Sequence, residues 1–525
     1  MEPKYDKNGF WIKDNVLAGY NGTKKKVVIP KKVKVISYEA FKDNKTIEEV
    51  QIPDSVAFIR YGAFQNCDNL VKINIPDKVT VIEKNTFYGC NSLEKVSLSK
   101  NLNEIGEEAF AYCKSLKKVD LPKKIKCIKD GAFNCCTSLN SIVFPESLEE
   151  IGQSFDSCRS LKSIVIPRTL KRIGIYAFSF CSNLESVTLY EGMKEIPDYM
   201  FRNCKSLVSI KIPSSVTRIG KYAFESCTKL ETIEMTDHVE EIGDQAFNNT
   251  KWFEEKYGDE ELPILNGILL DGSKCTNPVI PNTVKKLTEF CFAECELKKI
   301  VLPDTITEIP VGALSSDYLQ SVTLPKHLTK IGEGAFEGTK LKSIKIPEGV
   351  KVIEPCTFKQ CTRLESVELP DSIEIIGHHA FYQCTSLRKL NMTKNLKRID
   401  HMAFFGSLFY KIESSRTTLH VDNGVIISGR RLKGDIVLPK SVRVIAPQAF
   451  AQANITSIVI PDQVKEIPEE AFAFTHKLKK VTLPKNLVSI GKSAFDSSAI
   501  EEIKLPNKLK TIEDSAFYNT KLKSI

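Results

Sequence analysis

Apolar and polar residues alternate along this chain in a pattern that returns every 22 or 23 residues. Residues 161–181, LKSIVIPRTLKRIGIYAFSFC, show the unit, whose skeleton is L-x-x-I-x-I-P-x-x-V-x-x-I-G-x-x-A-F-x-x-C. Its phenylalanine recurs at 19 positions, and Leu314 replaces it once, which makes twenty repeats. These ladder phenylalanines are Phe41, Phe64, Phe87, Phe110, Phe133, Phe155, Phe178, Phe201, Phe224, Phe247, Phe292, Phe336, Phe358, Phe381, Phe404, Phe450, Phe472, Phe495 and Phe517. A repeat of this length indicates a solenoid.

The I-x-I alternation predicts one short strand per repeat, with both aliphatic side chains facing inward. One unit is too small to bury its own apolar face, so neighbouring units must stack, with their strands in parallel. Proline follows the strand in sixteen repeats, where its missing N–H does no harm to a ladder. The pattern therefore predicts a repeat solenoid of about 20 coils, with a parallel β-sheet on one face and short turns and loops on the other.

The slot after the second isoleucine holds either glycine or proline in many repeats. Examples are Gly106, Gly174, Gly220, Gly377, Pro197, Pro310 and Pro468. Because proline holds φ near −65°, we expect a bend here without left-handed backbone geometry.

Two longer spacings, of 45 and 46 residues, interrupt the repeats. Residues 251–280 and 408–438 each replace one repeat, and each contains a segment similar to DNVLAGYNG at 14–22: LNGILLDGS at 265–273 and DNGVIISGR at 422–430. The Asn-Gly pairs predict tight hairpin turns. We therefore expect three blocks within one solenoid, 1–250, 251–407 and 408–525, each opened by a hairpin-like segment. Because the last repeat stops two residues into its strand, a fragment of a longer protein is expected.

Eleven of the 16 cysteines occupy the slot three residues after the ladder phenylalanine or its equivalent. Other repeats place Thr, Ser, Asn, Asp or Ala there, which predicts a small, semi-buried site with free thiols rather than disulfides or zinc. Many unpaired thiols are typical of a reducing setting. The positions chosen to represent the structural ladder are Phe64, Phe87, Phe110, Phe178, Phe224, Phe381, Cys67, Cys90, Cys113, Cys181 and Cys227.

Composition narrows the classes of function. The chain is 42% hydrophobic and carries a net charge of +9 over 525 residues, which excludes disorder and a dedicated nucleic-acid binder. It has no apolar run that could span a membrane and no export signal at its start. His378 and His379 with Cys384 come nearest to a metal cluster, but they fill a variable, solvent-facing slot. We predict no catalytic, cofactor or metal site and no enzymatic activity.

Aromatic residues are absent from the outward positions of the predicted strands, which carry Ser, Thr, Lys and Val. They gather instead in the loop after the ladder phenylalanine, as at Tyr112 and Phe180, and in the two inserts. The insert residues proposed as partner contacts are Trp252, Phe253, Tyr257, Phe409 and Tyr410. The alternative is that Trp252 and Phe253 seal the space left by a missing coil.

The repeat skeleton and the NGI and NGV hairpins resemble the BspA-like class of leucine-rich repeat over nearly the whole chain. The resemblance implies surface or secreted proteins, some of which bind host or extracellular matrix proteins or other cells. It therefore predicts a protein-interaction or adhesion module with protein partners, without nucleic acid, and with end-to-end self-association as a further expectation. An intracellular scaffold remains the alternative because no signal peptide is present, as does the targeting arm of a larger protein.

Overall fold

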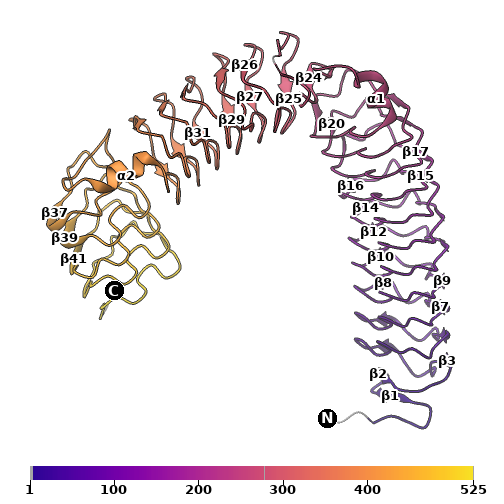
Figure 1. The fold of residues 1–525 in the computed structure, drawn as a ribbon. Coiled ribbons are helices and arrows are strands. Elements are labelled where there is room, and N and C mark those ends of the chain that lie inside the picture. The colour runs from indigo at the N-terminus through magenta and orange to yellow at the C-terminus, as the bar shows by residue number, and fades with distance from the viewer. Residues whose placement is uncertain (1–3, 277, 524–525) are drawn as a thin grey trace. The chain divides into compact units, whose positions relative to one another are not determined.

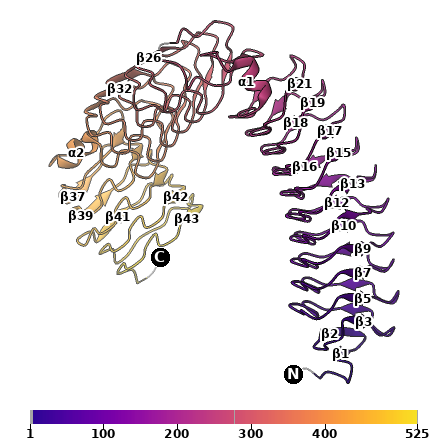
Figure 2. The same cartoon turned by 45° about the vertical axis from the view of Figure 1, so that its right-hand side comes forward.

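Each repeat forms one coil of a β-solenoid in the computed structural model, which describes residues 4–276 and 278–523. The chain divides into two compact units, Met1–Glu260 and Glu261–Ile525. Figure 2 shows the coils of the first unit lying one above another along its length. The predicted parallel solenoid is confirmed.

The I-x-I stretch forms the predicted strand, and these strands make the first ladder. They are β3 (Lys26–Val28), β5 (Glu49–Gln51), β7 (Lys72–Asn74), β9 (Lys95–Ser97), β11 (Lys118–Val119), β13 (Ser141–Ile142), β15 (Ser163–Val165), β17 (Ser186–Thr188), β19 (Ser209–Lys211), β21 (Thr232–Glu234), β26 (Lys299–Val301), β28 (Ser321–Thr323), β30 (Ser343–Lys345), β32 (Ser366–Glu368), β34 (Lys389–Leu390), β37 (Lys433–Val437), β39 (Asn454–Val459) and β41 (Lys480–Thr482). The central aliphatic residue faces the core while its neighbours face solvent, as in β7.

A second strand, which the sequence pattern did not predict, ends at the isoleucine before the glycine or proline slot. These strands are β4 (Val35–Ile36), β6 (Phe58–Ile59), β8 (Val81–Ile82), β10 (Glu104–Ile105), β12 (Cys127–Ile128), β14 (Glu150–Ile151), β16 (Arg172–Ile173), β18 (Glu195–Ile196), β20 (Arg218–Ile219), β22 (Glu241–Ile242), β25 (Lys286–Leu287), β27 (Glu308–Ile309), β29 (Lys330–Ile331), β31 (Val352–Ile353), β33 (Ile375–Ile376), β35 (Arg398–Ile399), β38 (Val444–Ile445), β40 (Glu466–Ile467), β42 (Ser489–Ile490) and β43 (Thr511–Ile512). The prediction of one strand per repeat was therefore incomplete.

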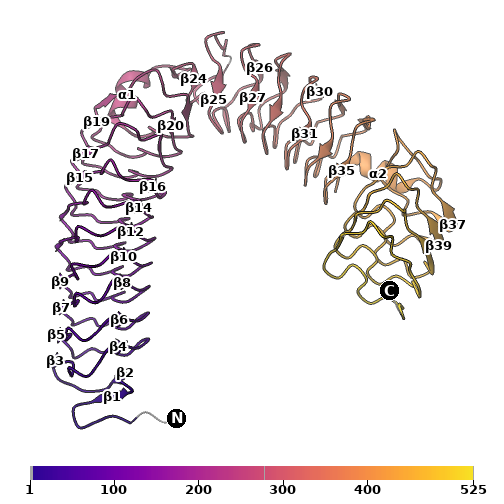
Figure 3. The ribbon, with the colours of Figure 1, turned by 180° about the vertical axis from the view of Figure 1, so that it is seen from behind.

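The chain bends between the two strands at a proline turn, in which the Val33 N–H donates to the Pro30 carbonyl at 3.0 Å. The same turn recurs in later coils, for example from Val56 to Pro53. After the turn, only two residues remain before the next bend, so the second strand is too short to show a period of two in the sequence. Figures 1 and 3 show the two ladders on different sides of each coil.

The glycine and proline slot has the expected geometry, because Gly106, Gly174 and Gly220 lie outside the left-handed region. A Cβ at Gly106 would lie 2.7 Å from the Ile82 carbonyl oxygen of the preceding coil. Close contact between coils, and not an unusual φ, is therefore what favours glycine here.

Proline in this slot has a further effect on the second ladder. Gly106 donates its N–H to Ile82 of the preceding coil at 2.8 Å, and the same bond recurs where the ladder is intact. Proline has no N–H to donate. At each of the three coils with Pro197, Pro310 or Pro468, the ladder is broken: β16 and β18, β25 and β27, and β38 and β40 belong to separate sheets.

The ladder phenylalanines stack in the core, with ring centroids 4.8 Å apart at the closest pair, Phe41 and Phe64, and nearly parallel planes. All five ladder cysteines named from the sequence are fully buried, not semi-buried. The thiol of Cys67 donates to the Phe41 carbonyl of the preceding coil at 3.1 Å, and Cys90 donates to Phe64 in the same way. All 16 cysteines are free, as the sequence predicted.

Both inserts contain a hairpin turn at the predicted place and a helix that was not predicted. Asn266 and Gly267 both have positive φ and join β23 (Ile264–Leu265) to β24 (Ile268–Leu269); Asn423 and Gly424 repeat this geometry before β36 (Val425–Ile426). The N-terminal equivalents are β1 (Phe10–Lys13) and β2 (Val16–Tyr20). The helices are α1 (Lys251–Tyr257) and α2 (Leu408–Ser415).

Candidate aromatic interface on the turn face

The third side of each coil is built by the x-x-A-F-x-x-C stretch, and we call it the turn face. Its backbone is held to the next coil by bonds such as Phe64 N–H to the Thr86 carbonyl, at 2.9 Å. The residues two positions before and two positions after the ladder phenylalanine have positive φ in most coils, as at Tyr176 and Phe180. This alternation turns their side chains outward while the phenylalanine points into the core.

Three consecutive coils carry tyrosine at the first of these positions. Tyr176 and Tyr199 stack with ring centroids 4.3 Å apart, and Tyr199 and Tyr222 stack 4.9 Å apart, with interplanar angles of 13° and 8°. All three rings are half-buried. We call this set the tyrosine ladder. Its outward edges form one continuous aromatic surface because the rings repeat at the coil spacing.

Arg202 binds the tyrosine ladder from the side. Its guanidinium carbon lies 5.7 Å from the Tyr199 ring centroid, 5.8 Å from Tyr222 and 5.9 Å from Phe180, which is 39% exposed. These distances are those of cation–π contacts. An ion pair with Glu225 holds the guanidinium in place. Tyrosine and arginine are the residue types that dominate binding energy at protein interfaces.

The backbone under the ladder is not the one that tyrosine prefers. Tyr176, Tyr199 and Tyr222 have φ values of 57°, 59° and 54°, a region in which a bulky side chain is unusual and costs about 1 kcal/mol or more. Other coils place glycine at this position, as at Gly62 and Gly131. Tyrosine is therefore not favoured here by the backbone conformation. What it adds at this position is ring stacking and an aromatic outer surface.

The pKa values of two hydroxyl groups of the ladder, those of Tyr199 and Tyr222, are raised. Partial burial, followed by the neighbouring Asp244 carboxylate, raises the pKa of Tyr222 to about 12. Burial and the Tyr176 hydroxyl also raise the pKa of Tyr199. Tyr199 and Tyr222 therefore offer neutral hydroxyl groups, not phenolates, to a partner.

The predicted contacts in the first insert end the phenylalanine stack. The centroid of the Trp252 ring lies 5.0 Å from that of Phe247, and the Lys256 ammonium lies 5.2 Å from the centroid of the Trp252 ring. Trp252 and Phe253 are half-buried, and Tyr257 is 5% exposed. Nearly all of Tyr257 is thus taken up by packing within the insert.

The second insert repeats this arrangement. Phe409, 8% exposed, packs edge-on against the last ladder phenylalanine of its block, Phe404, at 5.4 Å. Phe409 also lines a cavity of about 350 Å³ beside Glu413 and His420. Tyr410 is half-buried. Whether these five insert residues contact a partner stays a prediction.

Sequence reasoning missed the helices and the tyrosine ladder. Thr250 and Ser407 occupy the cysteine slot, and each hydroxyl accepts the N–H of the third helical residue, at 3.1 Å. This cap, followed by apolar residues at helical spacing, was the signal for the helices. The tyrosine ladder could have been found by reading the slot two residues before each phenylalanine.

The remaining candidates carry no constellation of metal ligands. The His378 and His379 ring centroids lie 3.7 Å apart with their planes tilted by 55°, but Cys384 lies in the core and donates its thiol to the Phe358 carbonyl. No group of three metal-ligating side chains occurs in residues 4–276 and 278–523. Across these same residues, neither helix is long or apolar enough to cross a bilayer.

Comparison with known families gives one clear match. The BspA type leucine-rich repeat region matches six segments, residues 12–133, 57–155, 153–261, 265–358, 351–434 and 428–525. No relative among curated proteins matches the chain.

Solved structures with a similar fold are leucine-rich repeat proteins. One from Bacteroides ovatus is 24% identical, with 92% of this chain and 98% of that chain covered and a TM-score of 0.26. A leucine-rich cell surface protein from Faecalibacterium prausnitzii is 22% identical, with 92% and 94% covered and a TM-score of 0.25. A leucine-rich repeat protein from T. pallidum is 26% identical, with 41% and 82% covered and a TM-score of 0.26.

Proposed function

Because this chain belongs to the BspA type leucine-rich repeat family, we propose that it is a non-enzymatic protein-binding module used in adhesion, at a cell surface or after secretion. Protein interaction is the role that the repeat architecture supports. The expected partners are host or extracellular matrix proteins. The tyrosine ladder with Arg202 is the surface that would contact them.

The observation that carries this proposal is the stack of Tyr176, Tyr199 and Tyr222 on a strained, outward-facing backbone. Rigid aromatic side chains lose little conformational entropy on binding and supply a large contact area. Buried tyrosines at interfaces commonly cost 2 kcal/mol or more when truncated, about thirtyfold in affinity.

The experiment measures binding of the purified protein to immobilised fibronectin, laminin and collagen by surface plasmon resonance. We expect Tyr199→Ser to weaken the strongest interaction by at least tenfold. Tyr38→Ser is the matched control, because Tyr38 is 62% exposed and lies in the same face, and its ring packs on no other ring in the part of the chain that the structure describes. Unchanged binding by Tyr199→Ser, or no binding by the unaltered protein, would overturn the proposal.

A second function, an intracellular scaffold, is favoured by the 16 free cysteines, since unpaired thiols are typical of reducing compartments. Burial weakens this argument, because burial raises the pKa of a thiol, as at Cys67. A thiol with a raised pKa reacts slowly. The two functions, adhesion and intracellular scaffolding, are distinguished by where the native protein is found. It is recovered separately from medium, cell envelope and cytosol, and its intact mass is measured in each fraction. Protein confined to the cytosol would contradict adhesion.

A further inference from the structure

The second ladder of the first unit is open at two places, between β6 and β8 and between β16 and β18, and we call the second opening the Pro197 gap. In neighbouring coils, Gly174 donates to the Ile151 carbonyl and Gly220 to the Ile196 carbonyl, both at 2.8 Å. Pro197 has no N–H for the Ile173 carbonyl. The N–H groups of Lys194 and Glu195 and the carbonyl of Lys171 also make no backbone bond in the described chain.

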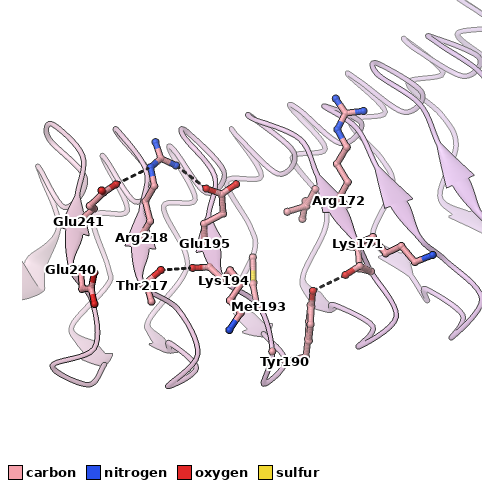
Figure 4. Close-up of a pocket in the computed structure, with 13 residues that line it drawn as sticks. Lys171, Arg172, Tyr190, Met193, Lys194, Glu195, Thr217, Arg218, Glu240 and Glu241 are labelled. Atoms are coloured by element: carbon pink, nitrogen blue, oxygen red, sulfur yellow. Dashed lines mark hydrogen bonds and ion pairs between the residues drawn. The ribbon is translucent and has the colours of Figure 1, made fainter.

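A cavity of about 620 Å³ lies at this gap. Its floor is apolar, with Leu170 and Met193 buried beneath it. Ile173 is half-exposed, whereas the corresponding isoleucines on either side, Ile151 and Ile196, are fully buried. Figure 4 shows Arg172 on one rim and Glu195, Arg218 and Glu241 on the other.

Basic and acidic side chains alternate from coil to coil just before the second strand, and this alternation ends at the gap. Lys126, Glu149 and Lys171 follow one another in successive coils, with ion pairs of 3.6 Å and 2.8 Å. The next residue in this column is Lys194, which forms no ion pair in the described chain. Figure 4 shows the Lys171 side chain directed away from the gap, toward the coil of its partner Glu149, so Lys194 is the lysine of this column that is left without an acid.

Another gap in the same ladder shows how the chain can satisfy open carbonyl groups. The coil before the second insert presents the carbonyls of Thr393 and Leu396, and the Arg443 guanidinium donates to both; Leu396 corresponds to Leu170 at the Pro197 gap. At the Pro197 gap, the described chain supplies only the Tyr190 hydroxyl, which donates to Leu170 at 2.7 Å. The carbonyls of Lys171 and Ile173 accept no hydrogen bond in the described chain, so both are open to a donor from a partner.

We propose that the Pro197 gap binds an extended segment of a partner protein as an additional parallel strand between β16 and β18. The N–H groups of the segment donate to Lys171 and Ile173, and its carbonyls accept from Lys194 and Glu195. Its acidic side chain pairs with Lys194. An aliphatic residue two positions later covers Ile173, because residues two apart in a strand lie on one face.

The required segment is acid-x-aliphatic, the pattern that the chain itself uses in this register at Glu149, Glu150 and Ile151. Binding of this kind obtains affinity from main-chain hydrogen bonds and specificity from alternate side chains. The site lies apart from the tyrosine ladder, and the proposal rests on the proposed function only in that the partner is a protein.

The test uses the full chain and a fluorescein-labelled peptide, acetyl-Ser-Leu-Glu-Ser-Ile-Gly-amide, with fluorescence anisotropy as the readout. We expect saturable binding, weakened at least tenfold when the peptide glutamate is replaced by lysine or its isoleucine by serine. Bound peptide should also slow hydrogen exchange at the Lys194 and Glu195 amides. Because the probe is synthetic, the result is independent of binding to matrix proteins.

Two variants place the site. Pro197→Gly restores the missing N–H, lets the ladder close as at Gly174, and should abolish binding; Pro310→Gly, the same change in the second unit, should not. Lys194→Glu should weaken binding tenfold or more, whereas Lys211→Glu on the first ladder should not. Thermal unfolding establishes that each variant is folded.

Three results would overturn the proposal: no peptide binding, equal binding by Pro197→Gly and Pro310→Gly, or unchanged exchange at residues 194 and 195. Binding that phosphate displaces and that ignores the peptide isoleucine would identify a simple anion site and would also overturn it.

Discussion

The slot three residues after the ladder phenylalanine shows how one atom changes the bonding of a coil. In ten of the eleven coils with cysteine in this slot, the thiol reaches the phenylalanine carbonyl of the preceding coil, as from Cys67 to Phe41. The thiol of Cys295 donates instead to Phe292 of its own coil. A hydroxyl with its shorter bond returns to the phenylalanine of its own coil, as from Thr475 to Phe472 at 2.7 Å. Ten of the thiols therefore join neighbouring coils, while hydroxyls such as those of Thr250 and Thr475 stabilise single turns, and the Thr250 hydroxyl also caps a helix.

Buried thiols should make the solenoid sensitive to alkaline pH. Burial raises the pKa of Cys67 from 9.0 to about 12, so the unfolded chain releases this proton near pH 9 and the folded chain keeps it until about pH 12. The free energy of unfolding is therefore unaffected by ionisation of this thiol below pH 9. As pH rises from 9 to 12, the free energy of unfolding falls by about 1.4 kcal/mol per pH unit for each such thiol. We expect the urea midpoint to fall steeply above pH 9.

Cys67→Thr should make this fall shallower by the contribution of one thiol, with little change at pH 7, because threonine already occupies the slot in other coils. Thr475→Ser is the control and should leave the alkaline slope unchanged. Equal slopes for Cys67→Thr and the unaltered protein would contradict this assignment of the titrating group.

At the scale of elements, the short helices take the place of a missing coil. The α1 cap is Thr250, which donates to the Phe247 carbonyl at 2.7 Å and accepts from the helix. One residue therefore ends the coil and begins the helix. The helix then places Trp252 against the last ladder phenylalanine of the block, so that this ring is not left exposed.

We expect Trp252→Ala to destabilise the first unit by about 3 kcal/mol, the lower end for a buried aromatic residue because its ring is only half-buried. Binding to the matrix proteins should persist, since packing against Phe247 and Lys256 covers the ring. Urea unfolding and surface plasmon resonance measure the two effects. Phe253→Ala, which removes the neighbouring half-buried ring of the same helix, is the control for loss of an aromatic side chain. Lost binding with unchanged stability would instead make Trp252 a contact residue.

At the scale of the whole molecule, stability is distributed along the chain because each coil contacts only its neighbours. The core of the second unit contains two apolar clusters, and β38 (Val444–Ile445) contributes Val444 to one and Ile445 to the other. Both residues of this strand are buried. The coil that follows the second insert is therefore where two stretches of core share one strand.

A single core deletion should act locally. Phe110→Ala removes one ring from the stack, which should cost about 3–5 kcal/mol and raise amide exchange in the coils next to residue 110, with the effect fading over several coils. The second unit, Glu261–Ile525, should not change. Phe381→Ala is the reciprocal control and should affect only the second unit. Equal loss of protection in both units would show that the chain unfolds as one cooperative body.

The sequence by itself determined the solenoid, its core and its turns. The regular spacing of Phe64, Phe87 and Phe110 required stacked coils, and the Asn-Gly pairs at 266–267 and 423–424 required hairpins, because both signals are local and repeat. The second ladder, the tyrosine ladder and the Pro197 gap depended on tertiary structure. A two-residue strand has no period to read, the stacking of Tyr176 on Tyr199 requires coils to be placed in register, and a missing N–H matters only where the neighbouring coil presents its carbonyl.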